Sequence, residues 1–321
     1  MSSASSERVR DDIVEYETKK NGLKRERQTI HLSITKLQVQ TPRFLLRLIA
    51  IQQGETMANK FAVVTGASSG IGYELARVFA ENGYDLLINS SGERLEQAAS
   101  DVKSLGVDVT AVQSDLSTYE GVEQLWREIE SSGRPVDAIA LNAGIGAGGD
   151  FVHETDLDKE LKMIQLNCSA VVHLAKRVLK QMVARNEGKV LITSSIAGTM
   201  PSPLEAVYGA TKAFDLSFAK SLRNELKDTN IAVTALQPGP TNTDFFRRAD
   251  MEDTKLGQEG KYTNDPREVA QQGFKALMNN EDHIYASSMK TKIEGELGRF
   301  MPDSVKAEMH RKQAEPKEKS A

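Results

Sequence analysis

Residues 61–79 read FAVVTGASSGIGYELARVF, and this stretch decides the fold. The short run Phe61–Thr65 is apolar and rich in β-forming residues, which predicts a buried strand. Thr65–Gly72 follows with the spacing G-x-x-x-G-x-G. Glycines permit a tight turn and close backbone approach, and a helix N-terminus attracts a diphosphate. The next apolar residues share one helical face, namely Ile71, Leu75, Val78 and Phe79. We therefore predict a strand, a nucleotide-binding loop and a helix, although this spacing alone also fits a plain glycine-rich turn.

Strands and helices continue to alternate after this unit. The pattern predicts further strands at 84–90, 107–113, 136–141, 189–193, 231–236 and 283–286. Helices are predicted at 93–105, from a capping box at 117–120 to about 132, at 157–185, at 206–227 and after Asp265. Strands alternating with helices of ten or more residues favour right-handed crossovers and a parallel sheet. We predict an α/β fold, a Rossmann-type doubly wound parallel sheet flanked by helices, in a single domain.

The two ends of the chain differ from this middle part. Residues 1–56 carry mixed charges without a sustained period, so we expect a disordered N-terminal extension there. Residues 53–56 could be encoded by a purine-rich ribosome-binding sequence, so we expect Met57 to be the natural start and residues 58–321 to fold alone. The predicted domain covers 57–290, and 291–321 form a C-terminal extension that becomes a frayed polar tail from about Lys306.

Composition excludes several classes of function. The chain has 321 residues, 39% hydrophobic and 27% charged, and a net charge of -4, which is an ordinary globular balance that does not call for nucleic acid. Its one cysteine, Cys168, excludes an internal disulfide framework, and the five scattered histidines show no zinc-ligand spacing. The apolar run at 44–51 is too short to span a bilayer. We expect a cytoplasmic protein with a metal-free site and no membrane span.

A second informative stretch is Tyr208-Gly-Ala-Thr-Lys212. Positions i and i+4 share a helix face, so the phenol and the ammonium can meet one ligand. A tyrosine that works near neutral pH needs its pKa lowered by about 3 units, or about 4 kcal/mol. A cation about 4 Å away at an effective dielectric near 20 supplies an interaction of that order. Such a pair also occurs by chance on helix flanks. Ser194 and Ser195 strengthen the catalytic interpretation, because they end a predicted strand, where open α/β sheets bind ligands.

In their order and spacing, these motifs resemble those of the short-chain dehydrogenase/reductase family over roughly residues 60–287. The family's TGxxxGxG motif is met by Thr65–Gly72, its NAG motif by 142–144, its YxxxK motif by Tyr208 and Lys212, and its PG motif by 238–239. The resemblance implies a catalytic set of Asn167, Ser195, Tyr208 and Lys212.

Each member of that set has an implied role. Tyr208 would exchange the proton at the substrate oxygen, and Ser195 would hydrogen-bond that oxygen. Lys212 would hold the nicotinamide ribose and lower the pKa of Tyr208. Asn167 would hold a water that connects Lys212 to solvent, although an asparagine inside a long helix can also cap a local kink.

The resemblance also implies a nicotinamide cofactor. The expected binding residues are Gly66, Ser68, Ser69, Gly70, Ile71, Gly72, Ser90, Asp115, Leu116, Asn142, Ala143, Gly144, Tyr208, Lys212, Pro238, Gly239, Thr241 and Thr243. Asp115 should meet the adenine. Residues 89–92, NSSG, lack both the acid that selects NAD and the arginine that often marks NADP. We favour NADP over NAD because no acid repels a 2′-phosphate there, although Ser69 stands where a basic residue would support this choice.

The resulting hypothesis is an NAD(P)-dependent oxidoreductase acting on a small ketone or secondary alcohol. The alternatives are a non-catalytic NAD(P)-binding sensor or scaffold, and an epimerase or dehydratase. Residues 144–149, 196–207 and a lid at 240–262 would enclose the substrate. The helices at 157–185 and 206–227 look apolar over much of their circumference, which favours a homodimer or homotetramer unless neighbouring loops bury them. The apolar residues on which this rests are Val171, Val172, Leu174, Ala175, Val178, Ala213, Phe214, Leu216, Phe218 and Ala219.

Overall fold

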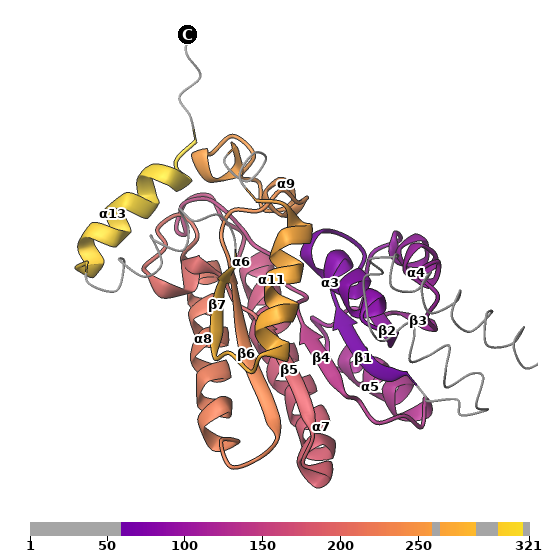
Figure 1. The fold of residues 1–321 in the computed structure, drawn as a ribbon. Helices are drawn as coiled ribbons and strands as arrows, with labels where there is room; N and C mark the ends of the chain where they lie inside the picture. Colours follow the sequence, from indigo (N-terminus) through magenta and orange to yellow (C-terminus); the bar gives the residue numbers. More distant parts are fainter. Residues whose placement is uncertain (1–58, 259–263, 287–300, 317–321) are drawn as a thin grey trace, which may run out of the picture. The chain divides into compact units, whose positions relative to one another are not determined.

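The computed structural model describes residues 59–258, 264–286 and 301–316. The expectations for residues 1–56 and for Met57 lie outside this part of the chain. Seven strands form one parallel sheet in the order β3-β2-β1-β4-β5-β6-β7 (Figure 1). The strands are β1 (Lys60–Thr65), β2 (Tyr84–Ser90), β3 (Val109–Gln113), β4 (Ala138–Leu141), β5 (Gly188–Thr193), β6 (Ile231–Pro238) and β7 (His283–Ala286). The larger helices are α3 (Gly70–Glu81), α4 (Leu95–Lys103), α5 (Tyr119–Ser131), α6 (Leu157–Ile164), α7 (Ala170–Arg185), α8 (Ala206–Glu225), α11 (Pro266–Met278) and α13 (Asp303–Ala314).

The strand order reverses at β1. Val64 of β1 lies in register with Ile88 of β2 on one side and with Ala140 of β4 on the other. The chain therefore winds outward in both directions from this strand, which places a crevice at the carboxyl ends of β1 and β4. The predicted doubly wound parallel α/β sheet is confirmed.

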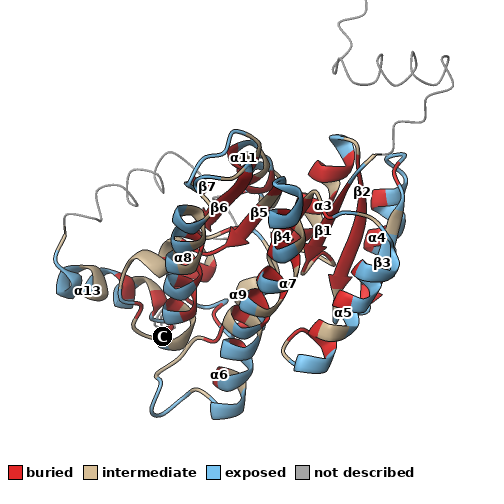
Figure 2. Ribbon diagram, turned by 90° about the horizontal axis from the view of Figure 1, so that it is seen from below, coloured by how far each residue is buried: buried red, intermediate tan, exposed pale blue. Residues whose placement is uncertain are grey.

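Alternate residues of β1 face different layers of helices. Phe61 and Val63 belong to a core cluster with side chains of α5, α7 and α8. Ala62 and Val64 belong to a second cluster with side chains of α3, α4 and α11. Figure 2 shows the buried strands in red between helices whose outer faces are exposed. A strand covered on both faces is apolar at every position, which explains the continuous apolar run in the sequence.

The helix predicted at 157–185 has a π-helical turn at Gln165–Ser169, which separates α6 from α7. Such turns are uncommon and often occur at functional sites. Asn167 lies in this turn, and its side chain bonds to Ile145 and Thr211 rather than capping the turn. The apolar residues keep their helical spacing through the π-helical turn, so the hydrophobic pattern did not reveal this turn.

The start of α5 differs from the predicted capping box. Thr118, rather than Ser117, is the N-cap, and its hydroxyl accepts from the backbone N–H of Gly121. Ser117 instead donates its hydroxyl to Asp115, at 2.7 Å. A threonine and a serine in succession can both cap, and the competing acceptor on Asp115 decides between them.

The frayed tail predicted from Lys306 is wrong for residues 306–316, because α13 is a regular helix. Ala314 joins a small apolar cluster with Ala249, Met251 and Leu256, and Pro316 forms a β-bridge with Thr254. The helix has few apolar residues, so its order depends on partners that are distant in sequence. Residues 317–321 lie outside the described part.

The described part of the chain shows neither a membrane-spanning helix nor a metal-binding cluster. No helix there is both long enough and apolar enough to cross a membrane. No group of three or more His, Cys, Asp or Glu side chains there could hold a metal ion.

An ion pair fixes the end of the sheet remote from the crevice. Asp85, at the start of β2, is buried and accepts from Arg134 at 2.8 Å, from the Asn59 amide at 2.7 Å and from the Asp108 N–H at 3.0 Å. Burial raises the pKa of Asp85, but these hydrogen bonds outweigh it, so that the pKa lies below its usual value.

Asp85→Asn should lower the free energy of unfolding at pH 7 by about 2 kcal/mol, because a charge-assisted buried hydrogen bond is lost. A carboxyl with a lowered folded-state pKa contributes stability above its unfolded pKa, near 3.9, and loses it as pH falls through the folded-state pKa. The difference between wild type and variant in denaturant titrations should therefore shrink below about pH 4. Asp228→Asn, at an exposed position, is the control. A difference independent of pH would contradict this account.

Candidate active site

A cavity of about 440 Å³ opens at the carboxyl ends of the strands. All 18 residues expected to bind the cofactor line it, together with Ser195; Asn167 does not line it. The expected residues are Gly66, Ser68, Ser69, Gly70, Ile71, Gly72, Ser90, Asp115, Leu116, Asn142, Ala143, Gly144, Tyr208, Lys212, Pro238, Gly239, Thr241 and Thr243. Segments from Gly66 to Gln313 thus meet at one edge of the sheet.

The glycine loop has the shape of a phosphate cradle. Gly66 has φ +69°, and a Cβ there would lie 2.8 Å from the Ala143 Cα. A Cβ on Gly72 would lie 2.2 Å from the Gly66 carbonyl oxygen. Ser69 is the N-cap of α3 but makes no side-chain capping bond. The N–H groups and positive dipole end of this 12-residue helix therefore suit a diphosphate, so the residues present fit a dinucleotide.

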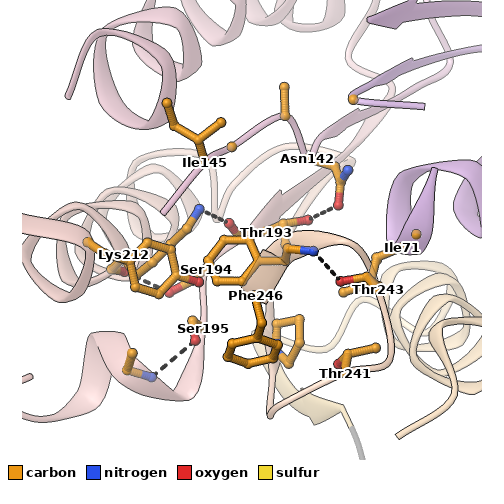
Figure 3. A pocket seen from close by; sticks show the side chains of 18 of the residues that line it. Ile71, Asn142, Ile145, Thr193, Ser194, Ser195, Lys212, Thr241, Thr243 and Phe246 are labelled. Atoms are coloured by element: carbon orange, nitrogen blue, oxygen red, sulfur yellow. Dashed lines mark hydrogen bonds between the residues drawn. The ribbon is translucent and has the colours of Figure 1, made fainter. Parts of the chain in front are cut away.

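Side-chain hydrogen bonds connect the ends of β1, β4 and β5 next to this loop. The Thr65 hydroxyl accepts from the N–H groups of Asn142 at 2.9 Å and Ala143 at 3.0 Å. The Asn142 amide donates to the Thr65 carbonyl at 3.2 Å and accepts from the Thr193 hydroxyl at 3.2 Å. Figure 3 shows the contact between Asn142 and Thr193. Asn142 therefore holds the ends of β1, β4 and β5 in register.

At the end of β2, serines occupy the position that selects between cofactors. Ser90 shares a hydrogen bond of 2.8 Å with Ser68 and accepts from the Gly92 N–H at 3.2 Å. Sequence analysis missed Arg94, which follows this turn and pairs with Asp244 at 2.7 Å. The sequence offered one signal for this residue, an arginine several residues after the strand. Asp244 offsets the charge of this arginine.

Asp115 lies after β3 at the rim of the cavity. It accepts from the Ser117 hydroxyl at 2.7 Å and from Lys162 at 3.1 Å. Burial raises its pKa, but the bonds from Ser117 and Lys162 outweigh this and hold the pKa below its usual value. The carboxylate thus stays ionised at the place where the adenine was expected.

Two adjacent serines after β5 have different partners. The Ser194 hydroxyl donates to the Lys212 carbonyl oxygen at 2.7 Å and is buried against α8. The Ser195 hydroxyl accepts from the Ala197 N–H at 3.2 Å and hydrogen-bonds with Tyr208. The structure therefore brings Ser195, rather than Ser194, together with the phenol.

The ammonium of Lys212 is held by two acceptors. It donates to the Thr193 carbonyl at 2.8 Å and to Asp215 at 3.0 Å (Figure 3 shows the first). Burial raises the pKa of Tyr208 and the charge of Glu205 raises it further, while the Ser195 hydrogen bond lowers it only in part. The lowered tyrosine pKa expected from the sequence is therefore not found, because burial and the charge of Glu205 outweigh the Ser195 hydrogen bond.

Asn167 stands behind this group and is fully buried. Its side chain accepts from the Ile145 N–H and donates to the Ile145 carbonyl, both at 3.0 Å, and donates to Thr211 at 3.0 Å. A Cβ on Gly144 would lie 3.2 Å from the Asn167 Oδ1 and 3.5 Å from the Lys212 Nζ. Asn167 thus fixes the loop after β4 against α8, next to Lys212.

Aromatic and C-terminal side chains close the other end of the cavity. Phe245, in the short helix α9 (Phe245–Arg248), has its ring centroid 5.2 Å from that of Tyr208. Met251, expected in a lid, is instead 1% exposed in the small apolar cluster. Sequence analysis missed the contribution of residues near and in α13, namely Met301, Lys306, Met309, His310 and Gln313. His310 pairs with buried Glu205 at 3.1 Å, which connects α13 to the start of α8.

Comparison with known proteins identifies the family. The family model for short chain dehydrogenases matches residues 60–254. Oxidoreductase UcpA of Salmonella typhimurium is 29% identical over 262 residues, which cover 78% of this chain and 97% of the relative. The NADP-dependent 3-hydroxy acid dehydrogenase YdfG of Salmonella typhi is 33% identical over 177 residues, which cover 55% of this chain and 71% of the relative.

A solved structure agrees with these matches. A short-chain dehydrogenase from Sphingobium yanoikuyae in complex with NADPH is 28% identical, with a TM-score of 0.65 over 70% of this chain and 87% of the other. The matched region includes the glycine loop, Ser195, Tyr208 and Lys212. With a doubly wound sheet, a dinucleotide cradle and these side chains in one cavity, the chain belongs to the short-chain dehydrogenase family of oxidoreductases.

Proposed function

We propose that this protein transfers hydride between NADP(H) and a ketone or secondary alcohol, with Tyr208 as the acid/base. The observation that carries the proposal is that Ser195, Tyr208 and Lys212 line the same cavity as the glycine loop. We propose that the chain has a catalytic domain at 57–290 and a C-terminal extension at 291–321. The substrate is a small carbonyl compound or alcohol, and the protein works in the cytoplasm.

The bound nicotinamide would supply or accept the hydride at the substrate carbon. The first turn of α3 would hold the diphosphate, Asp115 and Leu116 the adenine, and Lys212 the ribose. Ser195 would donate a hydrogen bond to the substrate oxygen as negative charge develops on it. Tyr208 would give its proton to that oxygen in reduction and take it back in oxidation.

The environment of Tyr208 keeps its phenol protonated. Because burial and Glu205 raise its pKa, the phenol keeps its proton at neutral pH in the described structure. A protonated phenol is the form that donates to a carbonyl oxygen. Tyr208 is thus in the form that the reduction step requires, and it would regain this proton from the alcohol in oxidation.

NADP is the proposed cofactor. The turn after β2 presents Ser90 and Ser91 and no acid, so that a 2′-phosphate meets hydroxyls rather than a repelling charge. Two similar proteins support this choice. YdfG is named as NADP-dependent, and the Sphingobium enzyme is a complex with NADPH. A screen of ketones and aldehydes with NADPH and NADH, followed by the absorbance of the reduced cofactor, tests the proposal directly.

The alternative from another class is a non-catalytic NAD(P)-binding sensor or scaffold. A pure binder needs no proton donor beside the nicotinamide, so the bond between Ser195 and Tyr208 favours the enzyme. Cofactor binding without turnover of any carbonyl compound or alcohol would favour the sensor.

Tyr208→Phe should lower kcat for the identified substrate by on the order of a thousandfold, because the proton donor is lost while the ring remains. The Kd for NADPH, measured by cofactor fluorescence, should stay near the wild-type value. Lys212→Ala, in contrast, should weaken NADPH binding by about tenfold or more as well as lowering kcat. Tyr208→Phe activity near that of wild type would reject the assignment.

Ser90→Asp should raise KM for NADPH by about tenfold or more, because a carboxylate repels the 2′-phosphate. KM for NADH should change little, since NADH has a ribose hydroxyl at that position. Ser104→Asp adds the same charge at an exposed position beyond α4 and should leave both values unchanged. An equal effect of Ser90→Asp on both cofactors would contradict NADP selection at this turn.

We propose a subunit interface that is smaller than the one expected from the sequence. Val171, Leu174, Ala175 and Val178 are buried against the sheet within one subunit, so they offer no surface. The large apolar side chains that remain exposed on α6, α7 and α8 are Leu157, Leu161, Ile164, Val172, Val183 and Phe214. We propose that these side chains pair two copies into a homodimer or the dimers of a homotetramer.

Phe214→Glu should shift the mass measured by light scattering during gel filtration from the dimer or tetramer toward the monomer, because a charge would be buried at the interface. Leu105→Glu, at an exposed apolar position outside these helices, is the matched control and should leave the mass unchanged. A wild-type protein that is monomeric at micromolar concentration would reject the interface.

A further inference from the structure

One ion pair joins two segments that border the cavity and are far apart in the chain. The guanidinium of Arg94 donates to Asp244 at 2.7 Å, although the two residues are 150 positions apart. Arg94 is the N-cap of α4 and comes soon after Ser91, whereas Asp244 is the N-cap of α9 and stands between Thr243 and Phe245. Ser91, Thr243 and Phe245 all line the cavity. The pair therefore bridges the turn after β2 and the segment after β6.

This bridge lies beside the first turn of α3. In the sheet, β1 lies between β2 and β6, so the pair spans the strand end from which the glycine loop leaves. A second hollow is lined by Ser69, Gly70, Arg94 and Asp244, among other residues. A Cβ on Gly70 would lie 2.9 Å from a methyl carbon of Thr243, so the segment after β6 packs directly on the start of α3. The ion pair is thus next to the place proposed for the diphosphate.

The pair belongs to a small cluster of charges. Arg247 approaches Asp244 at 3.5 Å, and Arg248 donates its Nε to the Asp244 carbonyl at 3.3 Å. The hydrogen bond from Arg94 is the main cause that holds the pKa of Asp244 below its usual value, so the carboxylate is ionised at neutral pH. Arg248 lines the cavity. One carboxylate therefore fixes Arg94 across the two segments, while positive charge remains for an anionic dinucleotide.

We propose, resting on the NADP(H)-dependent function above, that Arg94 and Asp244 form a clasp that retains the bound cofactor. The dinucleotide would lie across the carboxyl ends of the strands, with its diphosphate at the start of α3. The clasp joins the two segments that border the cofactor there, so release requires this pair to open. Arg94 and Asp244 thus slow cofactor release without contact with the reacting atoms. Because they hold protein segments together, they act on NADPH and NADH alike.

The competing role for Arg94 is a direct bond to the 2′-phosphate of NADP. In that case Asp244 would compete with the phosphate for the guanidinium, so its loss would strengthen NADPH binding and leave NADH binding unchanged. The clasp has the opposite consequence, because loss of either side chain opens the same bridge. The contact of 2.7 Å between Arg94 and Asp244 favours the clasp.

The test is the rate at which the reduced cofactor leaves. The enzyme loaded with NADPH or NADH is mixed with excess NADP⁺ in a stopped-flow instrument, and release is followed by nicotinamide fluorescence. Arg94→Gln and Asp244→Asn should each speed release of both cofactors by about threefold, the size expected for an exposed ion pair. The double variant should also be about threefold faster, rather than about ninefold, because both changes remove one contact. The difference from wild type should shrink in about 1 M salt, which screens exposed charges.

Arg177→Gln is the matched control. Arg177 forms an ion pair of the same length, 2.7 Å, with Glu123 between α7 and α5, and neither residue lines the cavity. This variant should leave the release rate unchanged. Unchanged release in Asp244→Asn would overturn the clasp. Slower release of NADPH alone in that variant would overturn it too, and would assign Arg94 to the 2′-phosphate.

The release measurement needs no substrate, so it separates the clasp from the proposed function. Faster release in the variants together with a failed ketone screen would retain the clasp and reject the oxidoreductase function. Turnover of a ketone with unchanged release would reject the clasp alone. A protein that binds neither cofactor would reject both.

Discussion

The close approach of two backbones at the end of β1 is the constraint on which the rest of this structure depends. A Cβ at Gly66 would lie 2.8 Å from Ala143, and one at Gly72 would lie 2.2 Å from the Gly66 carbonyl. Only with glycine at both positions can the loop fold onto the end of β4 and start α3 directly above it. Thr65 then bonds to the N–H groups of Asn142 and Ala143. The close approach of these two backbones also forms the cradle for a diphosphate.

Hydrogen bonds connect the end of β1 to the proposed catalytic side chains. Asn142 accepts from Thr193, whose own carbonyl receives the Lys212 ammonium. Asn167 fixes the loop after β4 to Thr211, the neighbour of Lys212. The lysine is thus held through main-chain groups whose positions the strand register sets. A substitution in the glycine loop should therefore disturb the lysine without contact with it.

The sequence was informative wherever one segment determined its own structure. Strand β2 was predicted at its observed bounds, Tyr84–Ser90, because its apolar run ends in turn-forming residues on both sides. The cap of α11 at Asp265 was also predicted, since Asp followed by Pro is a local signal. All expected cofactor-binding residues line one cavity, because motifs at the carboxyl ends of parallel strands meet at one edge. Such features need no knowledge of distant contacts.

The features that sequence analysis missed depend on partners far along the chain. Helix α13 looked like a polar tail, because its order comes from His310 on Glu205 and from Ala314 on Met251. The π-helical turn is invisible to a hydrophobic pattern, since the apolar spacing is kept on both sides of Asn167. Burial of α7 was underestimated, because a helix that packs against both the sheet and the neighbouring helix α5 can be apolar over a wide arc without facing another subunit.

The pairing of Lys212 with Asp215 changes how the YxxxK arrangement works in this chain. A lysine one turn from a tyrosine was expected to lower the tyrosine pKa by its charge alone. Here two acids, Glu205 and Asp215, flank the phenol on the same helix and both oppose that effect. Ser195 lowers the pKa through a hydrogen bond, but only in part. Burial of the phenol, with the two acids beside it, therefore raises the pKa of the proton donor despite the lysine on the same helix face. Helical spacing indicates which groups share a face, but the partners that each charge finds decide how those groups act.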